Sequence, residues 1–243
     1  MKITFFGTSH GVPEANRRCS SALITLDEEH RYFIDMGTCA VENLATCGIS
    51  VNSIKAVFLT HMHGDHTNGL IQFLDLCSWY YRDATPTVFF PETEGIEPLK
   101  AWLAANSVQM REDIPLKTVQ EGVVYDDGML RVSAFRTTHL RTSYAYLLEA
   151  GDKRVLFTGD LNGECPDKDF PIQTAQEQPL DLAVCEGAHL NATAYAPIFA
   201  QCRIKRVLIN HYPSKAIPDI FALAGQVAPL PVMLATDGLE ILV

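Results

Sequence analysis

Several features common in specialised proteins are missing from this sequence. No apolar run approaches the roughly 20 residues that a membrane-spanning helix needs. No repeat, low-complexity segment or proline- or glycine-rich linker divides the chain, so we expect a single domain over residues 1–243. The seven cysteines form no Cys-x-x-Cys pair, and residues 1–7 resemble a first strand rather than an export signal. We therefore expect reduced thiols and a cytoplasmic protein without a membrane partner.

Positive charge is also scarce. The chain has 19 lysines and arginines against 29 aspartates and glutamates, which gives a formal charge of −10 and a pI near 5.2. Proteins that bind nucleic acid without specificity use lysine and arginine to neutralise phosphates. The balance therefore argues against broad binding of bulk nucleic acid, although it leaves room for a local basic pocket.

Short apolar segments dominate what is present. Their β-branched and aromatic residues, with glycine or aspartate at the ends, predict strands, and Asp127-Gly128 and Ala150-Gly151-Asp152 predict hairpin turns. Spacings of three and four predict a helix over 68–81. A helix is also expected over 38–47, between Gly37 and Gly48, and further helices over 99–106 and 217–227. This order indicates two sheets covered by helices. The predicted strands are 2–6, 21–26, 32–35, 56–60, 87–90, 130–136, 144–149, 154–158, 182–185, 206–210, 232–235 and 240–243.

The most informative motif is His61-Met62-His63-Gly64-Asp65-His66, which follows the apolar stretch 56–60. Imidazole and carboxylate groups suit zinc and other first-row divalent ions. His61 and His63 lie two positions apart, so in an extended chain their side chains project the same way. Asp65 and His66 follow a glycine and can serve a second ion. The context, a strand end followed by a loop, favours a metal site over a histidine-rich surface loop.

The pattern His-x-His-x-Asp-His resembles the signature of the metallo-β-lactamase superfamily. This resemblance implies an α+β fold, a four-layer αββα sandwich that holds one or two metal ions at one edge of the sheets. It also implies three further ligands in a fixed order. His139 follows a strand that ends at 136–138, Asp160 closes the run 155–160, and His211 closes the run 207–211.

The resemblance then implies a dinuclear site. His61, His63 and His139 hold one ion, Asp65, His66 and His211 hold the second, and Asp160 bridges both. Zinc is the default for these ligands, with manganese or iron as alternatives. Two adjacent cations lower the pKa of a shared water enough to yield hydroxide near neutral pH. Members that cleave β-lactams typically have cysteine at the position of Asp160, so antibiotic hydrolysis is not expected.

Further segments resemble the branch that contains ribonuclease Z and the cyclic-phosphate phosphodiesterases. These segments are Gly7-Thr8-Ser9-His10-Gly11-Val12-Pro13 with Arg17-Arg18-Cys19-Ser20-Ser21, His139–Tyr144, Asp181–Glu186 and Ala235–Glu240. The segment between His139 and Asp160 is too short for the arm that ribonuclease Z uses to clamp transfer RNA. Cys185 replaces a histidine that is that family's presumed proton donor, although Glu186 is retained. The N-terminal zinc-binding cysteines of the phosphodiesterases are absent too, since only Cys19 lies there.

The candidate catalytic residues are Asp65, Glu186 and His189, with His189 as the replacement proton donor, at the start of a helix, or else an ordinary surface histidine. Asp35, in Asp35-Met36-Gly37-Thr38, either supports the metal site through hydrogen bonds or caps the following helix. For substrate binding the candidates are Arg141 and Ser143, with Arg17 and Lys215 as further anion-binding groups.

These expectations lead to a dinuclear hydrolase that attacks a small phosphodiester, such as a cyclic phosphate or nucleotide-like substrate, with a metal-bridging hydroxide. A carboxylic ester, lactone or thioester is the alternative substrate class. A transfer-RNA 3′ endonuclease and a non-catalytic metal-binding protein are weaker alternatives. The expected partner is a small anionic substrate. Because dimers are common among such relatives and among soluble proteins generally, a homodimer is also considered.

Overall fold

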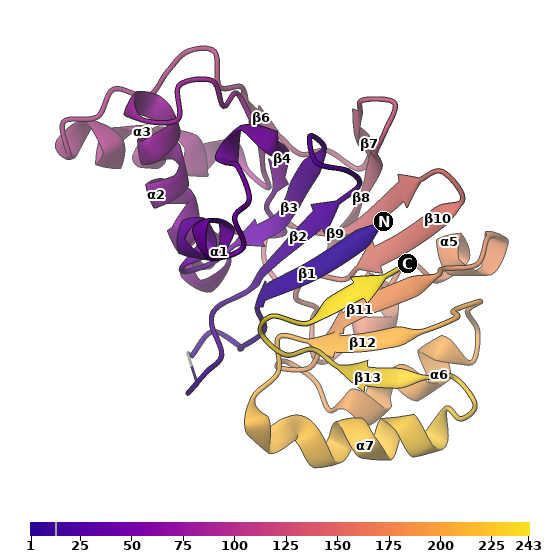
Figure 1. Cartoon of the computed structure of the whole chain (residues 1–243). Coiled ribbons are helices and arrows are strands. Elements are labelled where there is room, and N and C mark those ends of the chain that lie inside the picture. The colour runs from indigo at the N-terminus through magenta and orange to yellow at the C-terminus, as the bar shows by residue number, and fades with distance from the viewer. Residues whose placement is uncertain (13) are drawn as a thin grey trace. The chain divides into compact units, whose positions relative to one another are not determined.

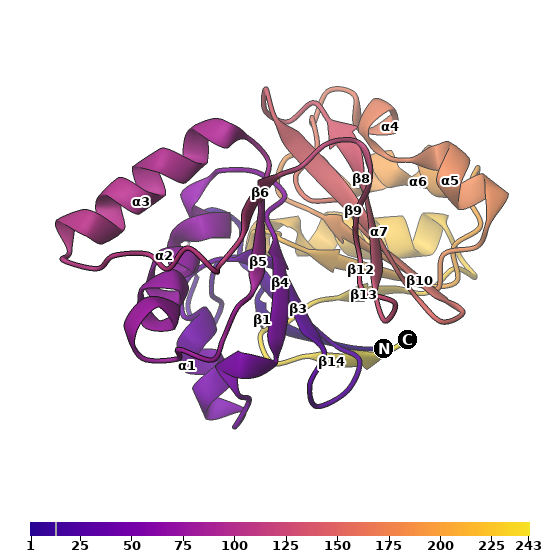
Figure 2. The same ribbon diagram turned by 90° about the horizontal axis from the view of Figure 1, so that it is seen from above.

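The computed structural model describes residues 1–12 and 14–243, so Pro13 of the opening motif lies outside the described residues. The chain divides into two compact units, each with its own seven-stranded mixed sheet (Figure 1 and Figure 2). That the chain is a single domain stays a prediction. Among the described residues, no helix is long and apolar enough to cross a membrane.

Unit 1 comprises residues 1–7, 11–119 and 237–242. Its first four strands in space pair antiparallel, and from β3 to β6 the pairing is parallel. The helices are α1 (Ala40–Thr46), α2 (Gly64–Trp79) and α3 (Ile96–Ala105), with 3₁₀ turns η1 (Val51–Ser53) and η2 (Thr93–Gly95). In spatial order the strands are β14 (Glu240–Leu242), β1 (Lys2–Gly7), β2 (Ser21–Thr25), β3 (Arg31–Met36), β4 (Ile54–Phe58), β5 (Thr87–Phe90) and β6 (Leu116–Thr118).

Helices α1, α2 and α3 lie on one side of this sheet. Figure 2 shows all three on the same side of strands β4, β5 and β6. Phe33 and Val57 of the sheet pack into one core with Leu44 of α1 and Phe73 of α2. Gly69 of α2 fits tightly here, because a Cβ at this position would lie 1.9 Å from the carbonyl oxygen of Gly37. This close approach brings α2 onto the loop that follows β3, and the N-terminus of α2 carries part of the histidine motif.

Unit 2 comprises residues 8–10, 120–236 and 243. Its strands from β7 to β10 pair antiparallel, and those from β10 to β13 pair parallel. The helices are α4 (Pro166–Asp169), α5 (Ile172–Glu177), α6 (Ala196–Phe199) and α7 (Ile217–Gln226), with 3₁₀ turns η3 (Ala192–Tyr195) and η4 (Ser214–Ala216). In spatial order the strands are β13 (Val232–Leu234), β12 (Val207–Asn210), β11 (Leu182–Glu186), β10 (Lys153–Phe157), β9 (Ser143–Ala150), β8 (Arg131–Thr137) and β7 (Gly122–Asp126).

The core of unit 2 forms between one face of its sheet and these helices. Leu156, Ala183 and Ile209 of three parallel strands pack with Tyr195 and Leu223 from the helical layer. Parallel strands covered in this way are buried along nearly their whole length, which explains their continuous apolar runs. Their polar residues therefore come where each strand ends.

Every predicted strand is present, and both hairpin turns occur, with Gly128 and Gly151 at positive φ. The predicted helices are confirmed as α1, α2, α3 and α7, but α2 begins at Gly64 rather than residue 68. Strands β6 and β7 were not predicted, because they are short edge strands with largely exposed side chains and no apolar run marks them. Nor were the short helices α4, α5 and α6, which are too brief for a helical period to be visible.

Candidate metal centre

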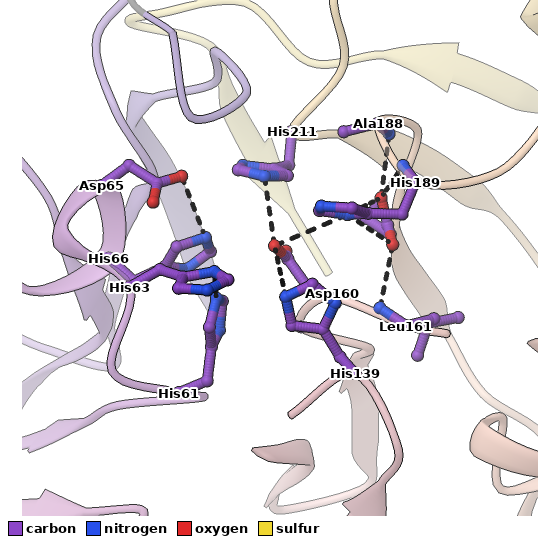
Figure 3. A network of polar contacts seen from close by, with 12 residues as sticks. His61, His63, Asp65, His66, His139, Asp160, Leu161, Ala188, His189 and His211 are labelled. Atoms are coloured by element: carbon purple, nitrogen blue, oxygen red, sulfur yellow. Dashed lines mark hydrogen bonds and ion pairs between the residues drawn. The ribbon is translucent and has the colours of Figure 1, made fainter. Parts of the chain in front are cut away.

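In unit 1 the histidine motif begins where β4 ends. His61 and His63 lie in the connection from β4 to α2, and Asp65 and His66 lie in the first turn of α2 (Figure 3). Asp65 is well placed there, since the N-terminus of a helix favours a negative charge. The predicted helix start was late by about one turn because these polar residues interrupt the apolar pattern.

The His61 and His63 rings converge. Nε2 of His61 lies 3.0 Å from Nδ1 of His63. Two nitrogens bound to one tetrahedral zinc ion are about 3.3 Å apart, given zinc–nitrogen bonds of about 2.0–2.1 Å. His61 is fully buried, and its other nitrogen, Nδ1, lies 3.0 Å from Oγ1 of Thr60. The pair therefore fits a shared ion, and the Thr60 hydroxyl helps to fix the orientation of the His61 ring.

Asp35 organises this half of the centre from the end of β3. Its carboxylate accepts hydrogen bonds from the backbone N–H and hydroxyl of Thr60, and its Oδ2 lies 2.7 Å from Nδ1 of His66. Asp35 has a φ of 56°, an unusual conformation for a residue other than glycine. Helix α1 has Cys39 rather than Asp35 at its N-cap. The predicted hydrogen bond between Asp35 and a candidate ligand is present at His66, its role in supporting a metal stays a prediction, and the predicted capping of α1 is wrong.

In unit 2 three rings surround one carboxylate. Asp160 follows β10 and is 3% exposed. Its Oδ2 lies 3.3 Å from Nε2 of His211, 3.6 Å from Nδ1 of His189 and 3.9 Å from Nε2 of His139 (Figure 3). Asp160, His189 and His211 each offer a ligand atom within 4.8 Å of the others. The segments after four different strands, β8, β10, β11 and β12, thus bring together the predicted side chains of unit 2.

The backbone near these residues is unusual in two places. Gly159 has a φ of 58°, and His211 has a φ of 48°. Left-handed backbone is readily adopted by glycine but is uncommon for histidine. The carbonyl of His211 accepts a hydrogen bond from the Gly187 N–H, which connects the loops after β12 and β11. Such strain often accumulates where a side chain must be aimed precisely.

Glu186 holds the loop that carries His189. Its carboxylate accepts hydrogen bonds from the backbone N–H groups of Leu161, Ala188 and His189 at 2.8–2.9 Å. Both of its oxygens also lie 3.1 Å from Nδ1 of His189 (Figure 3). His189 lies in the loop before η3, whose N-cap is Asn191, so the expected place at the start of a helix is slightly wrong. The ring nevertheless faces Asp160.

Cys185 is turned away from this cluster. It is fully buried in the core of unit 2, whereas Glu186, the next residue on β11, contacts the loops that hold Asp160 and His189. Burial, and after it the negative charge of Glu186, raise the pKa of Cys185 well above its usual value. Cys185 therefore stays a neutral thiol that packs the core.

The residues predicted to bind substrate differ in their surroundings. Ser143 is buried, and its hydroxyl bonds to Thr137 and accepts from the N–H of Leu140, a structural role in the turn after β8. The side chain of Arg141 is exposed in the same turn. Arg17 pairs with Glu14 at 2.8 Å, and Lys215 is exposed in η4. Binding of substrate by these residues stays a prediction.

Two contributors were absent from the sequence predictions. Thr60 contacts both Asp35 and His61, and a hydroxyl directly before the motif was a signal that could have indicated it. Asp169, at the end of α4, accepts hydrogen bonds from the N–H groups of Thr138 and Asn162. Nothing in the segment 166–169 marks Asp169 for this role, since its neighbours are also charged.

Comparisons with known proteins agree with this geometry. The family described as "Anti-Pycsar protein Apyc1" matches residues 1–177, well over half of the chain. The chain belongs to this family. It also matches curated proteins named Ribonuclease Z. The Geobacillus kaustophilus protein is 32% identical over 149 residues, which are 60% of this chain and 48% of that protein. The Cyanothece protein is 30% identical over 155 residues, which are 63% of this chain and 48% of that protein. The chain spans about half the length of these curated relatives.

Solved structures show the same fold over the whole chain. The metallo-β-lactamase fold protein YhfI from Bacillus subtilis has a TM-score of 0.80 at 20% identity and covers 99% of this chain and 98% of its own. The short form of human tRNase Z has a TM-score of 0.74 at 18% identity, and the match covers 100% of this chain and 99% of the tRNase Z chain. A diphosphatase from the PhnP family has a TM-score of 0.71 at 18% identity, and the match covers 100% of this chain and 97% of the diphosphatase chain.

These results confirm the predicted family and fold class. The chain has the α+β sandwich of metallo-β-lactamase fold proteins, and its sequence is similar to that of proteins named Ribonuclease Z over about half of their length. Its histidine and aspartate clusters have the donor atoms that suit a divalent metal ion.

Proposed function

We propose that this protein is a metal-dependent hydrolase of small phosphodiesters, with a cyclic phosphate or nucleotide-like substrate. In this proposal His61, His63 and His139 hold one divalent ion, Asp65, His66 and His211 hold the second, and Asp160 bridges them. Zinc is the proposed metal, because imidazole and carboxylate ligands suit it best. Two such ions supply a water of lowered pKa and offset the negative charge that develops on the phosphoryl group.

The observation that carries the proposal is the environment of Asp160. A buried carboxylate with three imidazole nitrogens within 3.9 Å is costly as a set of ordinary ion pairs, since buried charges must be fully compensated. The carboxylate of Asp160 and the Nε2 atoms of His139 and His211 suit a divalent cation, whereas Nδ1 of His189 is held by Glu186. The His61–His63 nitrogen pair and the Asp35–His66 contact supply a matching set of donors in unit 1.

Each supporting residue then has a definite task. Asp35 fixes the proton of His66 on Nδ1 and leaves Nε2 as the donor atom. Glu186 holds the His189 ring through Nδ1, so that Nε2 can deliver a proton to the departing alkoxide. General acid catalysis of this kind typically contributes about 10²–10⁴-fold in rate.

A small substrate is favoured by two features. The segment between His139 and Asp160 is taken up by the β9–β10 hairpin, which leaves no arm to clamp a transfer RNA. The net charge of −10 also disfavours a long polyanion. We therefore propose a small anionic partner rather than bulk nucleic acid. We also propose a homodimer, which light scattering would test.

The decisive test is a substrate panel with the metal-loaded protein. It should contain bis(p-nitrophenyl) phosphate, cyclic mononucleotides, a lactone, a thioester and a transfer-RNA precursor. Turnover of the phosphodiesters, lost on chelation and restored by zinc or manganese, is the expected result. Turnover of the lactone or thioester alone would support the alternative ester class, and cleavage of the precursor alone would support the alternative of a transfer-RNA 3′ endonuclease. Stoichiometric metal binding without any turnover would indicate a non-catalytic protein.

Variants add a second test. Asp65→Ala and His66→Ala should abolish hydrolysis while the folded state is retained by circular dichroism. His189→Gln should slow a substrate with an alkoxide leaving group by about 10²–10⁴-fold. It should affect a p-nitrophenyl ester less, because p-nitrophenolate departs without a proton. An equal loss of hydrolysis rate with both substrates would contradict the role of His189 as proton donor.

A further inference from the structure

The contacts of Asp169 connect the two loops of unit 2 that carry His139 and Asp160. Oδ1 of Asp169 accepts a hydrogen bond from the N–H of Thr138 at 2.9 Å, and Oδ2 accepts one from the N–H of Asn162 at 2.7 Å. Thr138 directly precedes His139, and Asn162 lies two residues after Asp160. One carboxylate therefore bridges the backbones of both loops.

Asp169 is built into the fold at this point. Its side chain is 2% exposed although it carries a charge, and it lies at the end of the short helix α4. A carboxylate has only acceptor atoms, and here each oxygen meets a backbone donor. A second contact supports the same connection, since Oγ1 of Thr137 lies 3.4 Å from the carbonyl oxygen of Asp160. The end of β8 and the loop after β10 are thus joined by hydrogen bonds between side chains and main-chain atoms.

We propose that Asp169 is a positioning residue that sets the separation of His139 and Asp160 and thereby determines how tightly the metal is held. Asp169 acts on the backbone alone, whereas Asp35 and Glu186 contact histidine rings directly. The proposal rests on the proposed function, in which His139 and Asp160 are metal ligands. Residues that orient ligands typically change metal affinity by about 10–100-fold when they are removed.

Asp181 offers a matched control in the same unit. It is also a buried aspartate, at 8% exposure, and its Oδ2 accepts a hydrogen bond from the Arg154 N–H at 2.9 Å. Its other oxygen accepts from Lys205. Arg154 and Asp181 lie at the starts of β10 and β11, the ends opposite to those that carry Asp160 and Glu186. Loss of Asp181 should therefore weaken the fold without moving His139 or Asp160.

The experiment compares wild type, Asp169→Asn, Asp169→Ala and Asp181→Asn over the full chain. The free energy of unfolding of each metal-free protein is first measured with urea, so that metal binding is compared between variants of similar stability. Zinc affinity is then measured by competition with a chromogenic chelator, and cobalt is substituted to record the visible absorption of the ligand field. We expect the Asp169 variants to bind at least one zinc ion about 10–100-fold more weakly. Their cobalt spectra should change, whereas Asp181→Asn should retain both properties at comparable stability.

Equal zinc affinity and an unchanged cobalt spectrum in folded Asp169 variants would overturn the positioning role. A parallel loss in Asp181→Asn would do the same, because it would make the effect one of general stability. Failure of both Asp169 variants to fold, with Asp181→Asn folded, would assign the carboxylate to the fold itself and also contradict the proposal. If wild type bound no metal, the proposed function would fail instead, so the two failures are distinguishable.

Discussion

Nδ1 of His66 lies 2.7 Å from Oδ2 of Asp35, and both side chains are almost completely buried. Thirty-one positions separate the two residues in the sequence, and the contact forms because α2 packs against the loop after β3. The carboxylate fixes which nitrogen of the ring carries the proton. His66 therefore presents its Nε2 atom, which lies 3.3 Å from Oδ2 of Asp65.

Replacing Asp35 by asparagine tests this relationship. The amide oxygen of the new side chain can still accept from the Thr60 N–H, but the charge that faces His66 is lost. We expect zinc affinity to fall by about 10–100-fold and the free energy of unfolding of the metal-free protein to fall by about 1–3 kcal/mol. Calorimetric zinc titration and urea unfolding would measure the two effects. Glu240→Gln removes the exposed ion pair with Lys2, while an amide oxygen can still accept from the Thr4 hydroxyl, so it should change stability by less than about 1 kcal/mol. Unaltered zinc binding in Asp35→Asn would contradict the role of Asp35.

Two glycines should respond to alanine in opposite directions. At Gly69 a Cβ would lie 1.9 Å from the backbone of Gly37, so α2 could not keep its place. We expect Gly69→Ala to destabilise the protein by about 3 kcal/mol or more, beyond the common range for single substitutions. At Gly225 of α7 a Cβ would meet no atom within 4 Å, so Gly225→Ala should stabilise by up to about 1 kcal/mol. Thermal unfolding of both variants provides the measurement; a neutral Gly69→Ala would refute the close packing.

The contribution of Asp181 should depend on pH. Burial alone would raise the pKa of its carboxyl, but hydrogen bonds from Lys205 and the Arg154 N–H outweigh it, and the pKa lies below its usual value. A depressed pKa stabilises the folded state above the unfolded pKa of about 3.9, and this stabilisation is lost as the pH falls through the folded value. Asp181→Asn should therefore lose about 1–3 kcal/mol at pH 7. The difference should shrink as urea unfolding is repeated at lower pH below about 4, and a constant difference would exclude this carboxyl as its source.

Cysteine reactivity should follow burial. Burial raises the pKa of Cys77 to about 12, with a smaller opposing effect from Arg111, and its side chain is fully buried in unit 1. Cys47 is exposed at the end of α1. Iodoacetamide at pH 8 should label Cys47 in the native protein, whereas Cys77 should be labelled only after unfolding, since the thiolate is the reactive form. Peptide mass spectrometry measures both; rapid native labelling of Cys77 would contradict its burial.

The sequence was most informative about residues that follow apolar strands. His139, Asp160 and His211 were predicted from the family resemblance together with their places after apolar segments, and the structure places His61, His139, Asp160 and His211 after β4, β8, β10 and β12. The prediction of reduced thiols also agrees with the structure, in which all seven cysteines are unpaired.

The sequence was least informative where contacts form between distant backbones. Asp169 acts on the N–H groups of Thr138 and Asn162, and any residue offers such groups, so no side-chain pattern reveals the contact. Ser143, which was predicted to bind substrate, forms local hydrogen bonds with Thr137 and the N–H of Leu140 that its sequence neighbours did not reveal. Its role in substrate binding stays a prediction. Which partner a polar group meets depends on the fold, not on its neighbours in sequence.

The placement of polar side chains just after β4, β8, β10, β11 and β12 has an evolutionary consequence. The paired strands determine most of the folding free energy, while the connecting loops determine the chemistry. Exchange of the other residues in 139–142 or 187–191, with His139 and His189 kept, is expected to change specificity while the sheets stay intact. New specificities can therefore arise in this family by changes in the loops while the strands are kept. The same exchange of loops between relatives can be made in the laboratory.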